Sequence, residues 1–188
     1  MQVLKDEIRK LILDTAEVLF LEHGFIDTTT RMIARQVGIS VSNLYLYYEN
    51  KEALYYAITD SYFQDFTQGV SFFLDHKNET DDTGKRLNQI LYDMIVLNRC
   101  KFLLILEKSK GTKYENFKIT LIEELKKHIQ YQMNSKVHNK DLLALVFANG
   151  LIEGIIIIAK EYQNAEQLYN NIECITEYHL EGIKNFLK

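Results

Sequence analysis

Hydroxyl, amide and ammonium side chains are concentrated between residues 28 and 51. Three threonines occupy positions 28–30, a Ser-Val-Ser-Asn run occupies positions 40–43, and Tyr45, Tyr47 and Lys51 follow. Hydroxyls and amides near helix ends can bond phosphate oxygens and base edges, and an ammonium can pair with a phosphate. This chemistry suits a polyanionic ligand, provided that neighbouring helices hold the groups on one surface.

The apolar pattern predicts the helices that would hold these groups. Apolar residues recur every three or four positions from about residue 3 to residue 23, where the His23-Gly24 pair ends the first helix. A second, short helix follows the threonines and closes at Gly38, and Ser40 begins a third helix that runs from about 41 to 47. Two short helices joined by a tight glycine-containing turn have the form of a helix-turn-helix.

The remainder of the chain also predicts helices. The sequence has no proline and 8 glycines among 188 residues, and 47% of it is hydrophobic, so long helices with a sizeable core are expected. After a polar loop at about 76–85, these helices fall near 84–98, 100–109, 113–135, 140–162 and 165–187, following a long helix at about 51–74. The expected fold is all-α, with about nine helices.

Charge gives no support for a nucleic-acid ligand. The net charge is −4, and the first 51 residues carry six lysines and arginines against seven acidic residues. Nucleic-acid binding normally shows as a basic patch. Two cysteines, Cys100 and Cys174, are too few for a disulfide framework, and the polar start of the chain has no secretory pattern, so we expect a cytoplasmic protein.

The order of residues from Phe25 to Leu54 resembles the N-terminal signature of TetR-family transcriptional regulators. The residues that carry the resemblance are Phe25, Thr28-Thr29, Ile33-Ala34, Gly38-Ile39-Ser40, Leu44-Tyr45, Tyr47-Tyr48, Lys51-Glu52 and Leu54. The resemblance implies an N-terminal three-helix helix-turn-helix domain at residues 1–50. It implies a C-terminal helical domain for effector binding and dimerisation at residues 51–188.

The resemblance also implies a function. The commonest case in the family is a homodimeric repressor that a small, largely apolar effector releases from a palindromic operator in double-stranded DNA. An activator or a co-repressed regulator of the same family is an alternative, and so is a helical protein-interaction module without DNA binding. The chain has none of the short enzyme motifs and its histidines lack metal-ligand spacing, so we expect no enzyme, no cofactor and no metal site.

We predict that the DNA contacts come from the two short helices and the start of the next one. The exposed N-terminal end of the third helix would enter the major groove, and hydroxyl and ammonium groups around it would hold phosphates. The predicted residues are Thr29, Thr30, Ser40, Val41, Ser42, Asn43, Tyr45, Tyr47 and Lys51. Core packing is the alternative for the two tyrosines, and it is the preferred role for Tyr48, where the family usually has a buried phenylalanine.

Three positions depart from the family pattern. Relatives often carry lysine and glycine where this chain has Val41 and Ser42, and a histidine where it has Leu46. Without the cation at position 41 a phosphate or guanine contact is absent. We therefore expect an operator sequence of its own and a shallow salt dependence for each subunit.

The middle helices would enclose the effector pocket, although ordinary core packing is the alternative for each aromatic residue. We chose apolar residues on those helices and the polar groups among them. The predicted pocket residues are Tyr92, Ile95, Asn98, Cys100, Leu104, Glu107, Tyr114, Phe117, Leu121, Phe147, Asn149 and Glu153. Glu153 would suit a cationic or hydrogen-bonding ligand.

The last two helices would form the dimer interface as a four-helix bundle between subunits. Two glycines four residues apart allow close approach, and the final helix has an apolar seam. The predicted residues are Gly150, Gly154, Leu168, Ile172, Ile175, His179, Ile183 and Phe186, with His179 as a packed or rim residue. Residues 142–159 are apolar enough for a membrane span, but Asn149 and Glu153 in their middle favour a buried helix and no membrane contact.

Overall fold

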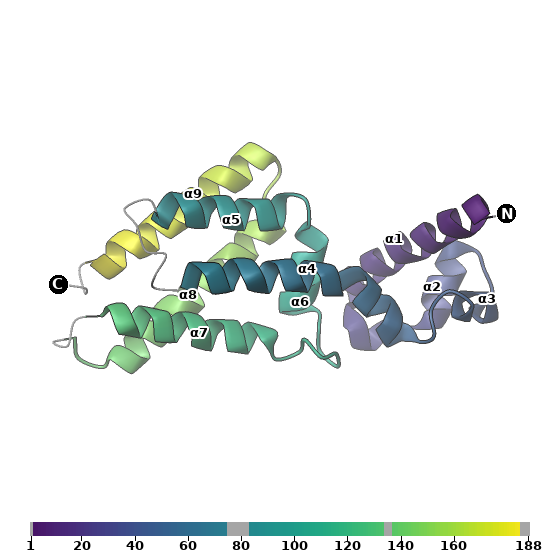
Figure 1. Cartoon of the computed structure of the whole chain (residues 1–188), viewed down its shortest axis with the longest axis horizontal. Helices are drawn as coiled ribbons and strands as arrows, with labels where there is room; N and C mark the ends of the chain where they lie inside the picture. Colours follow the sequence, from purple (N-terminus) through teal and green to yellow (C-terminus); the bar gives the residue numbers. More distant parts are fainter. Residues whose placement is uncertain (1, 75–82, 134–136, 185–188) are drawn as a thin grey trace. The chain divides into compact units, whose positions relative to one another are not determined.

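The computed structural model of the chain describes residues 2–74, 83–133 and 137–184 (Figure 1). The helices within these ranges are α1 (Gln2–Asp27), α2 (Thr30–Val37), α3 (Val41–Tyr45), α4 (Lys51–Leu74), α5 (Thr83–Val96), α6 (Arg99–Glu107), α7 (Phe117–Gln132), α8 (Lys140–Glu161) and α9 (Ala165–Lys184). No strand occurs in the described residues. The prediction of an all-α fold with about nine helices is confirmed.

The helix bounds follow the predicted ones closely, with one clear difference. The seventh helix begins at Phe117 instead of near residue 113. The residues before it form a loop closed by its own hydrogen bonds, in which the Thr112 amide donates to the Ser109 carbonyl at 3.0 Å. The predicted polar loop at 76–85 lies largely outside the described residues.

Gly24 interrupts the first helix where the His23-Gly24 pair predicted its end. Its φ of 81° and ψ of 167° are open to glycine and strained for other residues, and one further turn carries α1 to Asp27. The bend returns the Phe25 ring to the core, 5.8 Å from the Phe20 ring and 5.2 Å from the Tyr55 ring. The start of α4 thereby packs against the end of α1.

The chain divides into two compact units. The N-terminal unit contains Met1–Asp65 and Cys100–Asn116, and the C-terminal unit contains Phe66–Arg99 and Phe117–Lys188. Helix α4 begins in the first unit and continues into the second, so the compact units do not follow the expected division at residue 50. That division stays a prediction about function.

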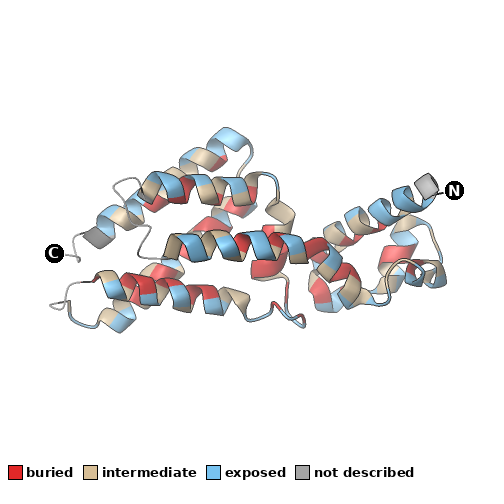
Figure 2. Cartoon of the chain, viewed as in Figure 1, coloured by how far each residue is buried: buried red, intermediate tan, exposed pale blue. Residues whose placement is uncertain are grey.

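The core of the N-terminal unit includes aromatic and aliphatic side chains from α1, α4 and α6. Phe20 and Tyr55 are fully buried, and their rings meet edge to face with centroids 5.2 Å apart. Buried positions of these helices are red in Figure 2. The Tyr55 hydroxyl donates to the Leu104 carbonyl at 3.0 Å, which satisfies the one polar atom of that side chain in the core. Burial raises the pKa of Tyr55 well above its ordinary value, so the phenol keeps its proton.

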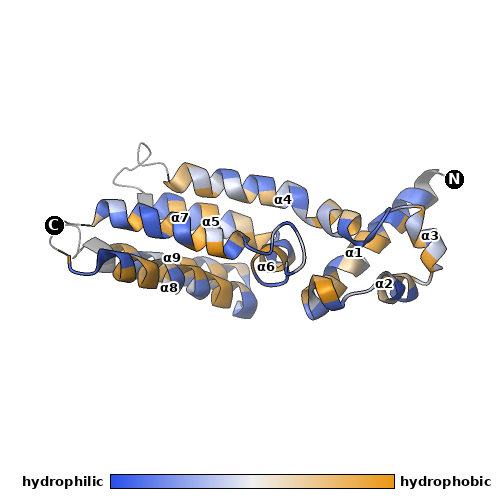
Figure 3. Ribbon diagram, turned by 90° about the horizontal axis from the view of Figure 1, so that it is seen from below, coloured by the Kyte–Doolittle hydropathy of each residue, from blue (hydrophilic) through white to orange (hydrophobic). Residues whose placement is uncertain are grey.

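In the C-terminal unit, α8 packs against both α7 and α9, and α5 packs against α9. Among the described residues α8 alone is long and apolar enough to cross a membrane by length and composition, and its apolar residues are orange in Figure 3. A helix buried in the core of a soluble protein can meet the same criterion of length and composition. The buried residues of α8 are Ala144, Ala148, Leu151, Ile152, Ile155, Ile156 and Ala159.

The seam that we predicted between subunits lies in part within one chain. An added Cβ on Gly154 would be 2.0 Å from Ile175 Cδ1, so this glycine admits the α9 of its own chain. Leu168 and Ile172 are fully buried within the chain and cannot reach a second copy, which corrects their assignment. Gly150 lies beside His179 of the same chain. The side chain of Ile183 and the whole of Phe186 lie outside the described residues.

Candidate nucleic-acid interface

Side-chain and backbone caps define α2 and α3. Thr29 Oγ1 accepts a bond from the Met32 amide at 3.2 Å, and Ser40 Oγ accepts one from the Asn43 amide at 3.1 Å. Between the helices Gly38 takes a left-handed conformation with φ of 80°, and the Ile39 amide donates to the Ala34 carbonyl at 2.9 Å. The helix-turn-helix predicted from the sequence is present.

Apolar contacts leave the N-terminal end of α3 open to solvent. Leu44 is buried on the inner face of α3, and Ile33 and Ala34 are buried on α2. Ser40 and Ser42 are exposed in consequence, while Val41 and Asn43 are partly exposed. The predicted base-reading residues therefore sit together at an accessible helix end.

Thr30 and Tyr45 form a polar pair between α2 and α3. The Thr30 hydroxyl lies 3.3 Å from the Tyr45 hydroxyl, and 48% of Tyr45 is exposed. Because only one of the two hydroxyls donates within the pair, the other keeps its proton to donate to a phosphate oxygen. Sequence spacing did not indicate this contact, since fifteen residues separate the partners.

The other two tyrosines are less accessible. Tyr47 and Tyr48 are partly exposed, and the Arg9 guanidinium lies 5.7 Å from the centre of the Tyr48 ring. Burial raises the pKa of Tyr48, while the Arg9 charge acts in the opposite direction. Tyr48 thus contacts Arg9 of α1, and its preferred role in core packing stays a prediction, as does the DNA contact of Tyr47.

Lys51 has a structural task instead of the predicted phosphate contact. Its ammonium donates to the carbonyls of Phe25, Ile26 and Thr28 at 2.6, 3.1 and 2.9 Å. It also lies 4.3 Å from the centre of the Phe25 ring. An ammonium has three N–H donors, and all three are occupied. The sequence showed a cation at a helix start but could not show the carbonyls that surround it.

Two cations on α2 were missed by the sequence argument. Arg31 and Arg35 are exposed, whereas Ile33 and Ala34 on the same helix are buried. Arg31 directly follows Thr30, so a positive charge is next to the Thr30–Tyr45 pair in the sequence. The outward helical positions opposite Ile33 and Ala34 could have identified both arginines.

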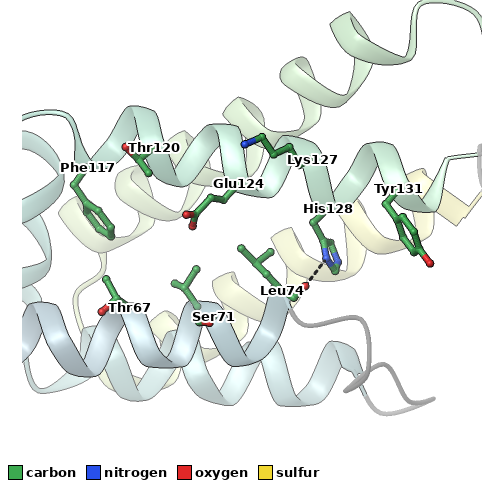
Figure 4. Close-up of a pocket in the computed structure, with 10 residues that line it drawn as sticks. Thr67, Ser71, Leu74, Phe117, Thr120, Glu124, Lys127, His128 and Tyr131 are labelled. Atoms are coloured by element: carbon green, nitrogen blue, oxygen red, sulfur yellow. Dashed lines mark hydrogen bonds between the residues drawn. The ribbon is translucent and has the colours of Figure 1, made fainter.

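A groove of about 760 Å³ lies between α4 and α7 in the C-terminal unit (Figure 4). Its residues come from the last turns of α4 and from one face of α7. They are Thr67, Val70, Ser71, Leu74, Phe117, Thr120, Glu124, Lys127, His128 and Tyr131. The groove combines apolar side chains with hydroxyls and both signs of charge, so it can hold a ligand with an apolar body and a polar end.

His128 ties the two groove walls together. Its Nδ1 lies 3.2 Å from the Leu74 carbonyl, which only accepts, so Nδ1 is the donor in this bond (Figure 4). In the neutral ring, His128 Nε2 then accepts a hydrogen bond from the side-chain amide of Gln132 at 3.2 Å. The imidazole is therefore a bridge between α4 and α7.

Of the predicted pocket residues, Phe117 lines this groove and the other eleven do not. Several already have partners elsewhere: Glu153 pairs with Lys118 at 2.6 Å, and the Asn149 amide donates to the Leu145 carbonyl at 3.0 Å. Cys100, Leu104, Glu107 and Tyr114 belong to the N-terminal unit. Apolar spacing identifies buried positions, but the space that two helices leave between them depends on their packing.

Sequence comparison connects the helix-turn-helix with known proteins. Residues 12–58 match the bacterial regulatory proteins of the tetR family. Over 131 residues the chain is 29% identical to IcaR, the HTH-type negative transcriptional regulator of the biofilm operon icaADBC from Staphylococcus epidermidis. The match covers 69% of this chain and 64% of that protein, so the chain spans less than two thirds of this relative.

Solved structures share the fold. A TetR-family transcriptional regulator from Bordetella parapertussis has a TM-score of 0.68 at 21% identity, covering 96% of this chain and 98% of that one. NalD, the secondary repressor of the MexAB-OprM multidrug efflux pump in Pseudomonas aeruginosa, has a TM-score of 0.58 at 15% identity, covering 95% and 96%. Residues 12–58 are thus those of a tetR-family regulator, and the whole chain shares the fold of such regulators.

The three positions that we expect to depart from the tetR-family pattern are all accessible. Ser42 and Leu46 are exposed, and Val41 is partly exposed. They lie in α3 or directly after it, next to the exposed helix end. The departures therefore alter the surface of the helix-turn-helix without altering its core.

Replacing Lys51 separates its structural task from a DNA contact. Lys51→Met removes three charge-assisted hydrogen bonds and should lower the free energy of unfolding by about 1.5–3 kcal/mol. Urea unfolding followed by circular dichroism measures the change. Lys110→Met, at an exposed position of the same unit, is the matched control and should have little effect. Unchanged stability in Lys51→Met would contradict the structural task.

Proposed function

We propose that this protein is a homodimeric repressor of transcription that acts on DNA in the cytoplasm. The observation that carries the proposal is the exposed N-terminal end of α3 beside the Thr30–Tyr45 pair. The match of residues 12–58 to the tetR family supports it, and so does the similarity to IcaR, which is a negative transcriptional regulator. Binding to the DNA upstream of the protein's own gene tests it directly.

The DNA-binding surface is built mainly from neutral groups. Residues 40–43 at the start of α3 enter the major groove, where the Asn43 amide and the Val41 methyls meet base edges. The Thr30 and Tyr45 hydroxyls bond phosphates, and Arg31 supplies a positive charge. Because Lys51 is occupied within the chain, few phosphates are neutralised, and the affinity falls only shallowly as salt rises.

Tyr45→Phe removes one hydroxyl and keeps the ring. The loss of one phosphate hydrogen bond should weaken specific DNA binding about 3- to 10-fold, measured by fluorescence anisotropy with a duplex of the upstream DNA. Tyr169→Phe is the matched control, since Tyr169 is partly exposed but lies on α9, away from the helix-turn-helix in the sequence. Equal affinity of Tyr45→Phe and the unchanged protein would remove Tyr45 from the interface.

The dimer interface is the exposed stripe of α8. Leu142, Val146, Gly150 and Ile157 are exposed, and steps of four and seven residues place them on one face of the helix. Tyr178 on α9, which packs against α8, is also exposed. Pairing of two such faces across a two-fold axis buries the apolar side chains and matches the symmetry of a palindromic operator.

A charge within this stripe should separate the subunits. Val146→Arg would bury an unpaired cation in the apolar interface, so sedimentation should show the mass falling from twice 22.1 kDa to 22.1 kDa. Val146 is 54% exposed, and Ile119→Arg at a 63% exposed position on α7 is the control that should leave the dimer intact. A Val146→Arg protein that keeps the double mass would move the interface elsewhere.

The effector site is the groove between α4 and α7. Val70, Leu74 and Phe117 offer apolar contacts, and Lys127 offers a cation for an acidic group on the ligand. The expectation of a small, largely apolar effector fits these side chains. Because α4 also follows directly on the helix-turn-helix, a ligand that favours another position of α4 would shift the DNA-binding state.

The anionic apolar dye 1-anilinonaphthalene-8-sulfonate serves as a probe of the groove. Val70→Glu places a carboxylate among the apolar groups, so the dye should bind about tenfold more weakly in a fluorescence titration. Phe72→Glu introduces the same charge on α4 at an exposed residue that does not line the groove. If Val70→Glu and the unchanged protein bind the dye equally, the groove is not its site.

A further inference from the structure

The loop between α6 and α7, residues 108–116, is folded by its own hydrogen bonds. The Ser109 hydroxyl donates to the Tyr114 carbonyl at 3.2 Å, and the Tyr114 amide donates to the Thr112 hydroxyl at 3.1 Å. Gly111 has a left-handed φ of 84°, and its amide donates to Glu115 Oε2 at 3.0 Å. These bonds give the loop a defined shape, so it can transmit a displacement along the chain.

We call Asp60, Lys113 and Tyr114 the Asp60 cluster, because their side chains hold this loop against α4. The Tyr114 hydroxyl donates to Asp60 Oδ1, and Lys113 Nζ donates to Asp60 Oδ2 at 2.9 Å. The Lys113 amide also donates to the Tyr56 hydroxyl at 3.0 Å, and the Tyr114 ring stacks on Phe63 at 4.3 Å. The start of α7 is thus linked through the loop to α4.

The same loop touches the end of α1. The Phe25 amide donates to the Lys108 carbonyl at 3.2 Å. An added Cβ on Gly111 would lie 3.1 Å from Ile26 Cγ1, so the loop backbone comes close to α1 at this point. Phe25 and Ile26 are two of the residues whose carbonyls bind Lys51. The loop therefore contacts the residues that hold the helix-turn-helix in place.

The hydrogen bond from the Tyr114 hydroxyl to Asp60 is the main bond of the Asp60 cluster. Tyr114 is 5% exposed, whereas about half of the Lys113 side chain is exposed to solvent, and an exposed ion pair contributes little to stability. Burial raises the pKa of Tyr114 above its ordinary value, and the Asp60 hydrogen bond raises it further. The phenol therefore keeps the proton that it donates to the carboxylate.

Both walls of the groove continue along the chain into the Asp60 cluster. Phe117, which lines the groove, follows Tyr114 by three residues at the start of α7. Thr67, which lines the other wall, follows Asp60 by seven residues on α4. A ligand that displaces either wall would pull on Asp60 or on Tyr114.

We propose that the Asp60 cluster couples the groove to the helix-turn-helix, with Asp60 and Tyr114 as positioning residues. A displacement of the start of α7 passes through Tyr114 and the loop to α1 and α4, and from there to α2 and α3. The proposal gives the regulatory mechanism of the effector site and rests on the proposed function for its biological meaning.

A double-mutant cycle in the full chain tests the coupling without a known effector. Phe117→Ala changes the groove wall, and Tyr114→Phe removes the bond to Asp60 while keeping the ring. In the otherwise unchanged chain, Phe117→Ala should speed the hydrogen exchange of the amides in residues 28–48, because local opening becomes easier. The exchange rates should rise measurably, by up to about tenfold. In the Tyr114→Phe background the same change should affect α7 and leave residues 28–48 unaltered.

Glu115→Gln is the control background, because it alters the charge of the same loop and keeps an acceptor for the Gly111 amide. The effect of Phe117→Ala on residues 28–48 should persist there. Equal effects with and without the Tyr114 hydroxyl, or no effect in the unchanged chain, would overturn the coupling. Phe117→Leu replaces Phe117→Ala if the latter does not fold. Specific DNA binding, measured in parallel on the unchanged protein, tests the proposed function separately.

Discussion

The arrangement of the helix-turn-helix depends on one ammonium group. Lys51 Nζ donates to three carbonyls at and just beyond the end of α1, where the free carbonyls of a helix end carry partial negative charge. The Gly24 bend turns these carbonyls toward α4. Since α2 and α3 lie in sequence between Thr28 and Lys51, both ends of the helix-turn-helix are held at one point.

One buried hydroxyl also stabilises the bend at the end of α1. Thr28 is fully buried, and its Oγ1 lies 3.0 Å from the Leu19 carbonyl and 2.8 Å from the Gly24 carbonyl. A buried carbonyl without a partner costs free energy, so these bonds favour one geometry of the bend. The Phe20, Phe25 and Tyr55 rings then fill the space behind it. Hydrogen bonds therefore favour one geometry of the bend, and the aromatic rings pack in the core behind it.

The same point connects the helix-turn-helix with the rest of the chain. Residues 100–116 complete the N-terminal unit, although they follow α5 in the sequence. Their loop contacts Phe25 and Ile26 of α1 and Asp60 of α4. A DNA-binding module cut at residue 50 would therefore lack the Lys51 bonds and the surface against which its first helix packs.

The sequence by itself determined the helices, their caps and the resemblance of the N-terminal residues to the tetR family. Periodic apolar residues, Gly24, Gly38 and the caps at Thr29 and Ser40 act within a few residues, so their effects can be inferred without the fold. It did not determine the partners of Lys51, the groove or the position of Leu168 and Ile172. An ammonium can bond a phosphate or a carbonyl, and an apolar seam can face its own chain or another, because the same residue types suit both. Only the tertiary structure brings the Phe25 and Thr28 carbonyls to Lys51, leaves space between α4 and α7, and closes α9 over Gly154.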